Sequence, residues 1–460
     1  MLLKKVKETV TKYGMLKAGD TVLVAVSGGP DSLCLLSVLQ SFAKELDLSL
    51  HLAHLDHRFR GRESADEALF VAETAKKMGI AATIEQFDVP AFCRERGLSA
   101  QAGARAVRYG FLNRVAEKVG ASRIAIGHTA SDQAETLIMR LVRGAGTSGL
   151  SAIPPLRENI IRPLIEVTRE EVLEYLHARG IAFVNDPSNS KPLYTRNRVR
   201  LDIMPVLRAF NPRIVETLAS EAAILRDENE AIEAYLATVS PGVVLREKDG
   251  VRLKRDEFNA LLPALKRRIL RTAVSEVDAG LIELSYDQVE DALRFMTSAQ
   301  TGRTMNLPSG LIIEREYDAF FLRPATERPE FRAELSIPGV TVIPEVSLEA
   351  EAWLFDGRAE TADENYLWQA RFDYDKICLP LEIRTRRPGD RFCPSGMGGK
   401  SKKLQDYFVD QKVPRRKRDI VPILASKADV IWVVGMRTDE RFLPGTETKR
   451  MLVVGVRKSG

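Results

Sequence analysis

The chain has 460 residues, 45% of them apolar and 28% charged, with a formal net charge of +5 at pH 7. A chain of this length is usually too long for a single hydrophobic core, so we expect two or three domains of ordinary globular composition. No stretch approaches the roughly 18 uninterrupted apolar residues of a membrane span, and residues 1–14 lack the apolar core of a signal peptide. We therefore expect a cytoplasmic protein.

The four cysteines, Cys34, Cys93, Cys378 and Cys393, are scattered along the chain and form no C-x-x-C pair. Their spacing argues against a structural zinc site and against a thioredoxin-like motif. Disulfides are not expected in a reducing compartment. The net charge is mild, so nucleic-acid binding would require a local basic patch.

The segment SGGPDS at 27–32 joins a predicted strand over 21–26 to a predicted helix over 31–43. The strand is rich in β-branched residues, and the helix has apolar residues at helical spacing with Asp31 or Ser32 placed to cap its start. A glycine pair at such a turn lets backbone N–H groups converge on an anion, and the helix N-terminus adds partial positive charge. A plain turn uses the same residue types. The agreement of strand, turn and helix favours a phosphate site.

The loop lacks the Gly-Lys-Ser/Thr ending of a Walker loop and the Gly-x-Gly-x-x-Gly of a dinucleotide site. It resembles instead the SGGxDS pyrophosphate loop of the N-type ATP pyrophosphatases, the PP-loop superfamily. That resemblance implies cleavage of ATP between its α and β phosphates. It also implies transfer of AMP to a substrate oxygen, followed by displacement of AMP by a nitrogen or sulfur nucleophile.

Strand and helix patterns alternate through the first part of the chain. Further strands are predicted over 48–53, 80–87 and 123–126, and further helices over 63–78, 100–119 and 133–141. Repeated strand–helix units predict an α/β fold with a doubly wound, mostly parallel sheet. Ligands of such sheets bind beyond the carboxyl ends of the strands, where Ser27, Asp56, His57 and His128 fall.

The remaining chain changes character twice. A long amphipathic helix is predicted over 217–236, followed by a hairpin with Asp249 and Gly250 at its turn and by helices near 256–275 and 285–297. From about residue 331 the pattern is rich in short strands. We therefore predict three domains: 1–212 with the phosphate loop, a mainly helical 213–330, and a smaller strand-rich α+β domain over 331–460.

Charged residues accompany the phosphate loop. Asp56 and His57 suit a magnesium nucleotide, although a merely charged loop is an equal alternative. Arg105 and Arg108 stand at i and i+3 on one helix face, where planar guanidinium groups suit phosphate recognition. An arginine pair on a helix most often lies on the solvated surface, so its assignment to phosphate binding depends on the neighbouring residues.

Asp132 and Glu135 are spaced i, i+3 at the start of the predicted helix after His128. One interpretation is a capping pattern, with Thr129 or Ser131 as the cap and the acids stabilised by the helix dipole. The other is a carboxylate pair that holds magnesium, or that binds and deprotonates a cationic amine. Their position beside the expected ATP site favours the second interpretation.

The strongest basic patch spans 384–418, where twelve lysines and arginines face only Asp390, Asp406 and Asp410. Tyr407 and Phe408 are interleaved with these cations. Such a concentration attracts a phosphate backbone. No duplex-DNA reading motif is present, so we expect structured RNA as the partner rather than DNA.

Several segments together closely resemble the tRNA(Ile)-lysidine synthetase family. They are SGGPDS (27–32), DHRFRGRESADE (56–67), ARAVRYGFL (104–112), GHTASDQAETLIMRLVRGAGTSGL (127–150), RPLIEVTREEV (162–172), DPSNSKPLYTRNRVR (186–200) and RRPGDRF…KKLQDYF (386–408). The resemblance is most specific in the first 200 residues and only generic over 213–380. It implies ATP-dependent ligation of free L-lysine to C2 of the wobble cytidine in the isoleucine tRNA with a CAU anticodon. AMP and pyrophosphate are released, and decoding changes from AUG to AUA.

The resemblance also implies roles for single residues. Asp31, Arg108, Asp132 and Glu135 are the expected catalytic residues, and Asp31 is also the expected Mg²⁺ ligand. The expected ATP-binding residues are Ser27, Gly28, Gly29, Pro30, Asp31, Ser32, Asp56, His57, Arg105 and His128. The expected tRNA-binding residues are Arg196, Arg200, Arg387, Arg391, Lys402, Lys403, Arg415 and Arg416, with Arg196 and Arg200 either touching tRNA or linking its binding to the site.

Three alternatives stay open at this point. Another PP-loop tRNA modifier, such as a cytidine thiolase, would need paired cysteines for a persulfide or an iron–sulfur cluster, and the cysteines here are dispersed. A glutamine-dependent amidotransferase would need its own nucleophilic cysteine. A non-catalytic RNA-binding protein would form no AMP from ATP. The sequence gives no coiled-coil seam, so whether the chain forms a homodimer stays undecided.

Overall fold

The computed structural model describes residues 1–58, 62–184, 195–278, 280, 283–325, 330–357, 365–427 and 429–459. Residues 59–61 of the DHRFRG segment and 186–194 of the DPSNSKPLYTRNRVR segment lie outside this set. Contacts between residues divide the chain into two compact units, Met1–Tyr235 and Leu236–Gly460. Within the described residues, no helix is both long and apolar enough to cross a bilayer.

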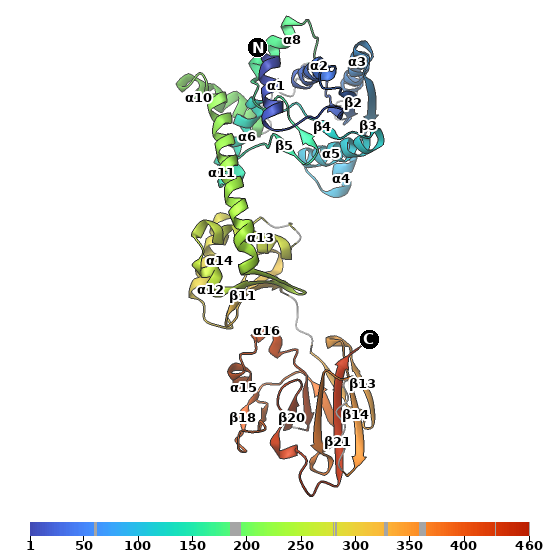
Figure 1. The fold of residues 1–460 in the computed structure, drawn as a ribbon, viewed down its shortest axis with the longest axis vertical. Coiled ribbons are helices and arrows are strands. Elements are labelled where there is room, and N and C mark those ends of the chain that lie inside the picture. The colour runs from blue at the N-terminus through green and yellow to red at the C-terminus, as the bar shows by residue number, and fades with distance from the viewer. Residues whose placement is uncertain are drawn as a thin grey trace. The chain divides into compact units, whose positions relative to one another are not determined.

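The first unit is built on a six-stranded sheet in the order β3-β2-β1-β4-β6-β5 (Figure 1). Every neighbouring pair is parallel except β5 and β6, which are antiparallel. The strands are β1 (Thr21–Ala25), β2 (Ser49–Asp56), β3 (Ala81–Gln86), β4 (Arg123–Ala125), β5 (Leu156–Arg157) and β6 (Ile160–Ile161). This order confirms the predicted mostly parallel α/β fold.

Strand β1 shows why the sheet is covered on both faces. Val22 and Val24 belong to a core with α1, α2 and α8, whereas Leu23 belongs to a second core with Phe111 and other residues of α5. Successive side chains of a strand point to opposite faces, so a strand that is apolar throughout requires helices on both sides. The helices concerned are α1 (Leu2–Lys12), α2 (Pro30–Ala43), α5 (Ala100–Val119) and α8 (Arg169–Ala178).

The other helices of this unit follow the predicted pattern closely. They are α3 (Arg62–Met78), α4 (Val89–Arg96), α6 (Ala130–Arg143), α7 (Thr147–Leu150), α9 (Thr195–Arg198), the π-helical turn η2 (Val199–Ile203) and α10 (Met204–Phe210). The long helix α11 (Ile214–Val243) continues past the boundary between the units.

One prediction about helix α2 is wrong. Neither Asp31 nor Ser32 caps it, because the cap is Gly29 and no side chain bonds to the free N–H groups. Pro30 occupies the first helical position, where its fixed φ suits a helix and its missing N–H costs nothing. The helix therefore starts one residue earlier than its apolar spacing indicates.

The second unit begins with three helices and a five-stranded antiparallel sheet in the order β7-β8-β11-β10-β9. The helical middle is confirmed, and the hairpin over 243–254 proves to be the edge of a larger sheet. The elements are β7 (Val244–Glu247), β8 (Gly250–Lys254), α12 (Arg255–Ala260), α13 (Pro263–Val277), α14 (Tyr286–Ser298), β9 (Thr304–Asn306), β10 (Leu311–Arg315) and β11 (Ala319–Pro324).

The strand-rich end of the chain forms two four-stranded sheets, β12-β16-β19-β20 and β13-β14-β21-β15. Phe372 and Trp432 belong to the core that the two sheets share. The strands are β12 (Arg332–Glu334), β13 (Gly339–Ile343), β14 (Leu348–Asp356), β15 (Trp368–Asp373), β16 (Leu381–Arg384), β19 (Ile423–Ser426), β20 (Asp429–Val433) and β21 (Arg450–Lys458). The basic stretch holds the short pair β17 (Arg391–Phe392) and β18 (Lys402–Lys403) and the helices α15 (Leu404–Asp410) and α16 (Arg415–Arg418).

Candidate active site

The phosphate loop is held in shape by its own serines. The hydroxyl of Ser32 donates to the carbonyl of Gly29 at 2.9 Å and accepts from the N–H of Ser27 at 3.2 Å. Gly28 has a φ of +86°, a conformation that a side chain disfavours, and its carbonyl accepts from the N–H of Val184 at 3.0 Å. The first N–H groups of α2 have no partner within the helix. The loop is thus ready to receive an anion.

A second glycine lets the β4–α6 loop lie against the start of α2. A Cβ on Gly127 would stand 3.0 Å from both the carbonyl carbon and the carbonyl oxygen of Asp31, so any side chain would require the backbone of α2 to shift by a few tenths of an ångström. Glycine permits this approach without such a shift. It places His128 and the first turn of α6 beside the phosphate loop, as the convergence of strand ends predicts.

Three carboxylates gather at this edge: Asp31 on α2, and Asp132 and Glu135 on α6. Burial, reinforced by the negative charge of Asp132, raises the pKa of Asp31 to about 6, while the guanidinium of Arg169 acts against the shift. Nη1 of Arg169 lies 3.6 Å from Oδ2 of Asp31, and Oδ1 of Asp31 is buried with no hydrogen-bond partner among the described residues. Asp31 is therefore close enough to the predicted pair, Asp132 and Glu135, for both charges to act on its pKa.

Glu135 is the most enclosed of the three carboxylates, with its side chain 4% exposed. Arg200 binds it through two hydrogen bonds, from Nε at 2.6 Å and from Nη2 at 3.0 Å. Arg196 adds a longer ion pair at 3.6 Å and donates to the hydroxyl of Thr136 at 2.8 Å. Burial raises the pKa of Glu135, and the bonds from Arg200 oppose that rise.

The same two arginines were expected to serve tRNA binding. The structure places both of them against the acidic first turns of α6, since α9 and η2 pack on α6. Of the two roles that the sequence left open for Arg196 and Arg200, this position suits a link to the site better than a surface contact. The tRNA role itself stays a prediction.

Asp132 fills the capping role that the sequence left open, and its catalytic role stays a prediction. Its Oδ2 accepts from the N–H of Thr129 at 2.9 Å, and Thr129 Oγ1 accepts from the N–H of Asp132, which completes a capping box. Its Oδ1 points toward Arg200, whose Nη2 lies 3.9 Å away. One carboxylate oxygen thus fixes the helix start, while the other has only a distant ion pair among the described residues.

The predicted ATP-binding histidines are neutral near pH 7. Burial, together with the positive charge of Arg108, lowers the pKa of His57 to about 4. Burial also lowers the pKa of His128 to about 4, and its Nδ1 accepts a hydrogen bond from Nε of Arg162 at 3.2 Å. These imidazoles can orient a ligand through hydrogen bonds but carry no charge for it at neutral pH.

The remaining predicted ATP-site residues differ in exposure. Asp56 is buried, and its Oδ1 accepts from the N–H of Arg58 at 2.8 Å. Arg108 is exposed on α5, and its charge reaches both His57 and His128. Arg105 is exposed too, with its guanidinium 4.9 Å from the centre of the Tyr109 ring. Arg108 is therefore at the site edge, and Arg105 contacts the ring of Tyr109.

Two residues of this edge were not singled out from the sequence: Arg162, which fixes His128, and Arg169, which faces Asp31. Arg162 is buried and also donates to the carbonyl of Pro154 at 2.7 Å. Both belong to the RPLIEVTREEV segment, so the motif was visible, but their partners lie more than thirty positions away in the chain. Such pairs become evident only in the folded structure.

The predicted tRNA-binding residues of the second unit fall into two groups. Arg387, Arg391, Lys403 and Arg415 are exposed, and Lys402 is half-buried and paired with Asp410. Arg416 is buried instead and bonds three carboxylates: Glu316 at 2.7 Å, Glu247 at 2.8 Å and Asp249 at 2.9 Å. Its guanidinium also lies 3.6 Å from the centre of the Phe321 ring. Its charge is thus already used inside the protein.

The aromatic residues of the basic stretch are not surface residues. Tyr407 and Phe408 are 2% and 0% exposed, and both pack with Phe392 in a small core. They interleave with the cations in the sequence, but they do not share the surface with them. Together with Leu404 they form the buried side of α15.

Comparison with known proteins agrees with this geometry. Residues 2–207 match the PP-loop domain, and residues 381–454 match the TilS substrate C-terminal domain. The fold and the loop thus define a protein of the PP-loop class. A tRNA(Ile)-lysidine synthase of Symbiobacterium thermophilum is 39% identical over 99% of this chain and 98% of its own. Those of Caldanaerobacter subterraneus subsp. tengcongensis and Geobacter sulfurreducens are 33% and 35% identical, covering 98% and 99% of this chain and 97% of each relative. The chain belongs to the tRNA(Ile)-lysidine synthase family.

Proposed function

We propose that the chain ligates L-lysine to C2 of the wobble cytidine of the CAU-anticodon isoleucine tRNA, through an adenylated tRNA, with ATP converted to AMP and pyrophosphate. The observation that carries this proposal is the meeting of the phosphate loop with Asp31, Asp132 and Glu135 at one sheet edge. A carboxylate cluster beside a phosphate site suits an amine nucleophile, because it binds an ammonium group and accepts its proton.

In the first step, the C2 carbonyl oxygen of the cytidine attacks the α-phosphorus of ATP, and pyrophosphate leaves. The N–H groups of Gly28 and Gly29 and the hydroxyls of Ser27 and Ser32 hold the leaving pyrophosphate. Arg108 offsets the charge that develops on the α-phosphate, as preorganised donors do in other transfer reactions.

In the second step, the ε-amine of lysine attacks C2, and AMP leaves with the former carbonyl oxygen. Free lysine has a pKa of about 10.4, so its amine must lose a proton before it attacks. We assign the acceptance of that proton to Asp132, whose Oδ1 has only a distant ion pair within the part of the chain that the structure describes. Glu135 is engaged by both nitrogens of Arg200, so we assign it to positioning.

We also propose a Mg²⁺ requirement, with Asp31 as the protein ligand. The buried Oδ1 of Asp31 has no hydrogen-bond partner among the described residues, which fits a hard cation that prefers oxygen. The described residues contain no cluster of three metal ligands. This fits an ion held by one carboxylate, the substrate phosphates and water. When bound, the ion offsets phosphate charge.

For tRNA binding we propose the exposed cations of the second unit, Arg387, Arg391, Lys403 and Arg415, together with Lys402. We keep the three-domain division at 1–212, 213–330 and 331–460, with the first part catalytic and the other two binding tRNA. Exposed arginines and lysines suit the phosphate backbone of RNA.

The test is ATP-dependent incorporation of labelled lysine into a transcript of the CAU-anticodon isoleucine tRNA. A transcript of the initiator methionine tRNA is the control. We expect modification of the first and not of the second, and equal modification of both would remove the claim of specificity. The alternative of a cytidine thiolase predicts incorporation of sulfur instead. Cys34, the cysteine nearest the loop in sequence, is buried with its pKa raised to about 12, so it forms no thiolate there.

A further inference from the structure

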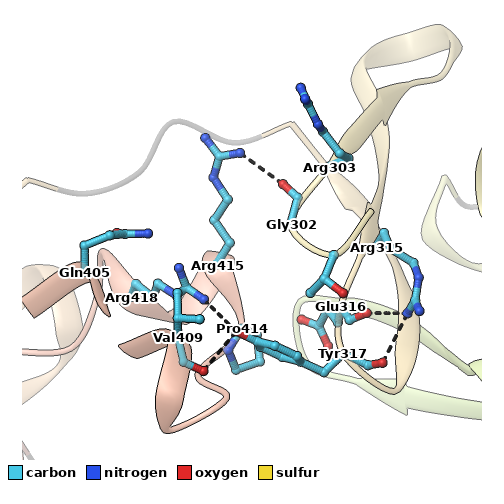
Figure 2. A pocket seen from close by; sticks show the side chains of 11 residues that line it. Gly302, Arg303, Arg315, Glu316, Tyr317, Gln405, Val409, Pro414, Arg415 and Arg418 are labelled. Carbon is cyan, nitrogen blue, oxygen red and sulfur yellow. Dashed lines mark hydrogen bonds between the residues drawn. The ribbon is translucent and has the colours of Figure 1, made fainter. Parts of the chain in front are cut away.

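The second unit contains a cavity of about 410 Å³ between the β9–β10 edge of the middle sheet and the helices α15 and α16. Gly302, Arg303 and Tyr317 line it from the sheet side, and Arg415 and Arg418 line it from α16. Figure 2 shows Arg415 extended to the carbonyl of Gly302, Arg303 directed away from that carbonyl, and Arg418 directed at Tyr317. Three guanidinium groups therefore border one space.

None of these three arginines has a carboxylate partner among the described residues. Nη1 of Arg415 donates to the carbonyl of Gly302 at 3.0 Å. Arg418 is 7% exposed, and it donates to the carbonyl of Val413 at 2.9 Å and to the hydroxyl of Tyr317 at 3.1 Å. The side chain of Arg303 is exposed and makes no hydrogen bond or ion pair within the described part of the chain.

The one carboxylate that lines the cavity does not neutralise these arginines. Glu316 is bound by Nε of Arg416 at 2.7 Å and by Nη2 of Arg252 at 2.7 Å. A fourth lining arginine, Arg315, is directed to the backbone carbonyls of Glu316 and Tyr317 (Figure 2). The cavity therefore has an excess of positive charge. Arg418 is buried, and a buried guanidinium without a counter-ion is costly, so a bound anion would offset that cost.

We propose that this cavity binds a phosphate group of the RNA backbone; this inference rests on the proposed function, because it takes tRNA as the partner. Planar guanidinium groups are suited to phosphate oxygens, and three arginines without a carboxylate partner among the described residues line this cavity. Gln405 also lines the cavity and follows two residues after Lys403, so the site adjoins other exposed cations. One bound phosphate would thereby connect the middle sheet to the basic helices.

The site extends the basic patch that the sequence indicated. Arg415 and Arg418 belong to that patch, whereas Arg303 comes from the middle segment, outside 384–418. A contact of this kind fixes the position of the RNA and reads no base. We therefore expect it to contribute equally to every tRNA that the second unit binds.

The experiment measures binding of the CAU-anticodon isoleucine tRNA transcript to the full chain as a function of KCl concentration. The variants are Arg303→Gln, Arg415→Gln and the double variant. The control is Arg294→Gln, which removes an exposed arginine of α14 that does not line the cavity. We expect the double variant to lose about tenfold in affinity and about 0.7–0.9 in the slope of log affinity against log salt, the value of one phosphate contact.

Unchanged affinity and slope in the double variant would overturn the proposal. So would a result in which inorganic phosphate raises the melting temperature of the wild type but not of the double variant, while tRNA affinity is the same for both. That outcome would mark a site for a free anion. Equal melting temperatures without phosphate exclude misfolding of the variants. Lysine incorporation by the wild type is measured separately, so failure of the proposed reaction is distinguished from failure of this site.

Discussion

Arg200 holds both carboxylate oxygens of Glu135, from Nε at 2.6 Å and from Nη2 at 3.0 Å. The two residues lie 65 positions apart in the chain, on η2 and α6, so the pair ties the last helices of the first unit to the helix that carries the acidic cluster. Because Glu135 is almost fully enclosed, its charge depends on this partner. The pair therefore links the stability of this region to the geometry of the site.

Replacing Arg200 with glutamine leaves a buried carboxylate without its main partner. We expect the free energy of unfolding to fall by about 3–5 kcal/mol, which urea denaturation measures. Arg198→Gln is the matched control, because Arg198 is 72% exposed and its ion pair with Asp202 is long, at 3.8 Å, so its loss should cost about 0.5 kcal/mol or less. If Arg200→Gln costs no more in the wild type than in a Glu135→Gln background, the two residues are not coupled.

The ionised carboxylate of Asp31 should lower the free energy of unfolding at neutral pH. Its pKa of about 6 in the folded state lies above the ordinary value of 3.8, so the folded state binds more protons than the unfolded state between those pH values. Stability from this group is therefore present below pH 4 and lost as pH rises to about 6. We expect Asp31→Asn to be more stable than the wild type at pH 7, by roughly 3 kcal/mol at most.

The same variant should lose ATP–pyrophosphate exchange. Asp202→Asn, which changes an exposed carboxylate of the same unit, is the control for both measurements. The expected pattern is a gain in stability with a loss of exchange, and the gain should disappear near pH 4. Wild-type exchange in Asp31→Asn would remove Asp31 from the first step.

The pH dependence of exchange should follow the ionisation of Asp31. The profile of kcat/KM for ATP reports groups of the free enzyme, so we expect it to fall about tenfold per pH unit below about 6. Arg169 lowers the pKa of Asp31 from 3.6 Å away, so Arg169→Gln should move this fall to higher pH. His57 and His128, with pKa values of about 4, add no further change between pH 6 and 8. An unshifted profile in Arg169→Gln would contradict this assignment.

How much of this site was predictable differs from residue to residue. The phosphate loop, the strand order that brings Asp56, His57 and His128 to one edge, and the pairing of Asp132 with Glu135 all follow from local pattern and parallel topology. The partners of the carboxylates could not be predicted in this way, because Arg169 and Arg200 are far from Asp31 and Glu135 in the sequence and meet them only in the fold. The middle sheet was missed for a related reason. Strands such as β9, with three residues, carry too little pattern to be distinguished from loop.

Asp132 and Glu135 should separate in single-turnover measurements. Asp132→Asn keeps the shape and an oxygen for Thr129, so we expect the adenylated tRNA to form normally and lysine transfer to fall roughly 10²–10⁴-fold, as for loss of a general base. Glu135→Gln should instead reduce stability and both steps together, because it loosens Arg200. Transfer at the wild-type rate in Asp132→Asn would assign proton acceptance to Glu135.

Arg416 and Lys403 test the division of the basic stretch into internal and exposed cations. Arg416 bonds three carboxylates, one of which, Glu316, has a side chain only 1% exposed. Arg416→Gln should therefore lower the free energy of unfolding of the second unit by about 3–5 kcal/mol.

Lys403→Gln should leave stability within about 0.5 kcal/mol of the wild type, because surface changes seldom cost more. It should weaken tRNA binding and reduce its salt dependence by about one phosphate contact. The two measurements are urea denaturation and tRNA binding at several KCl concentrations, below the unfolding transition of each variant. The opposite result, a stable Arg416→Gln with weak tRNA binding, would return Arg416 to the tRNA-binding surface that the sequence predicted.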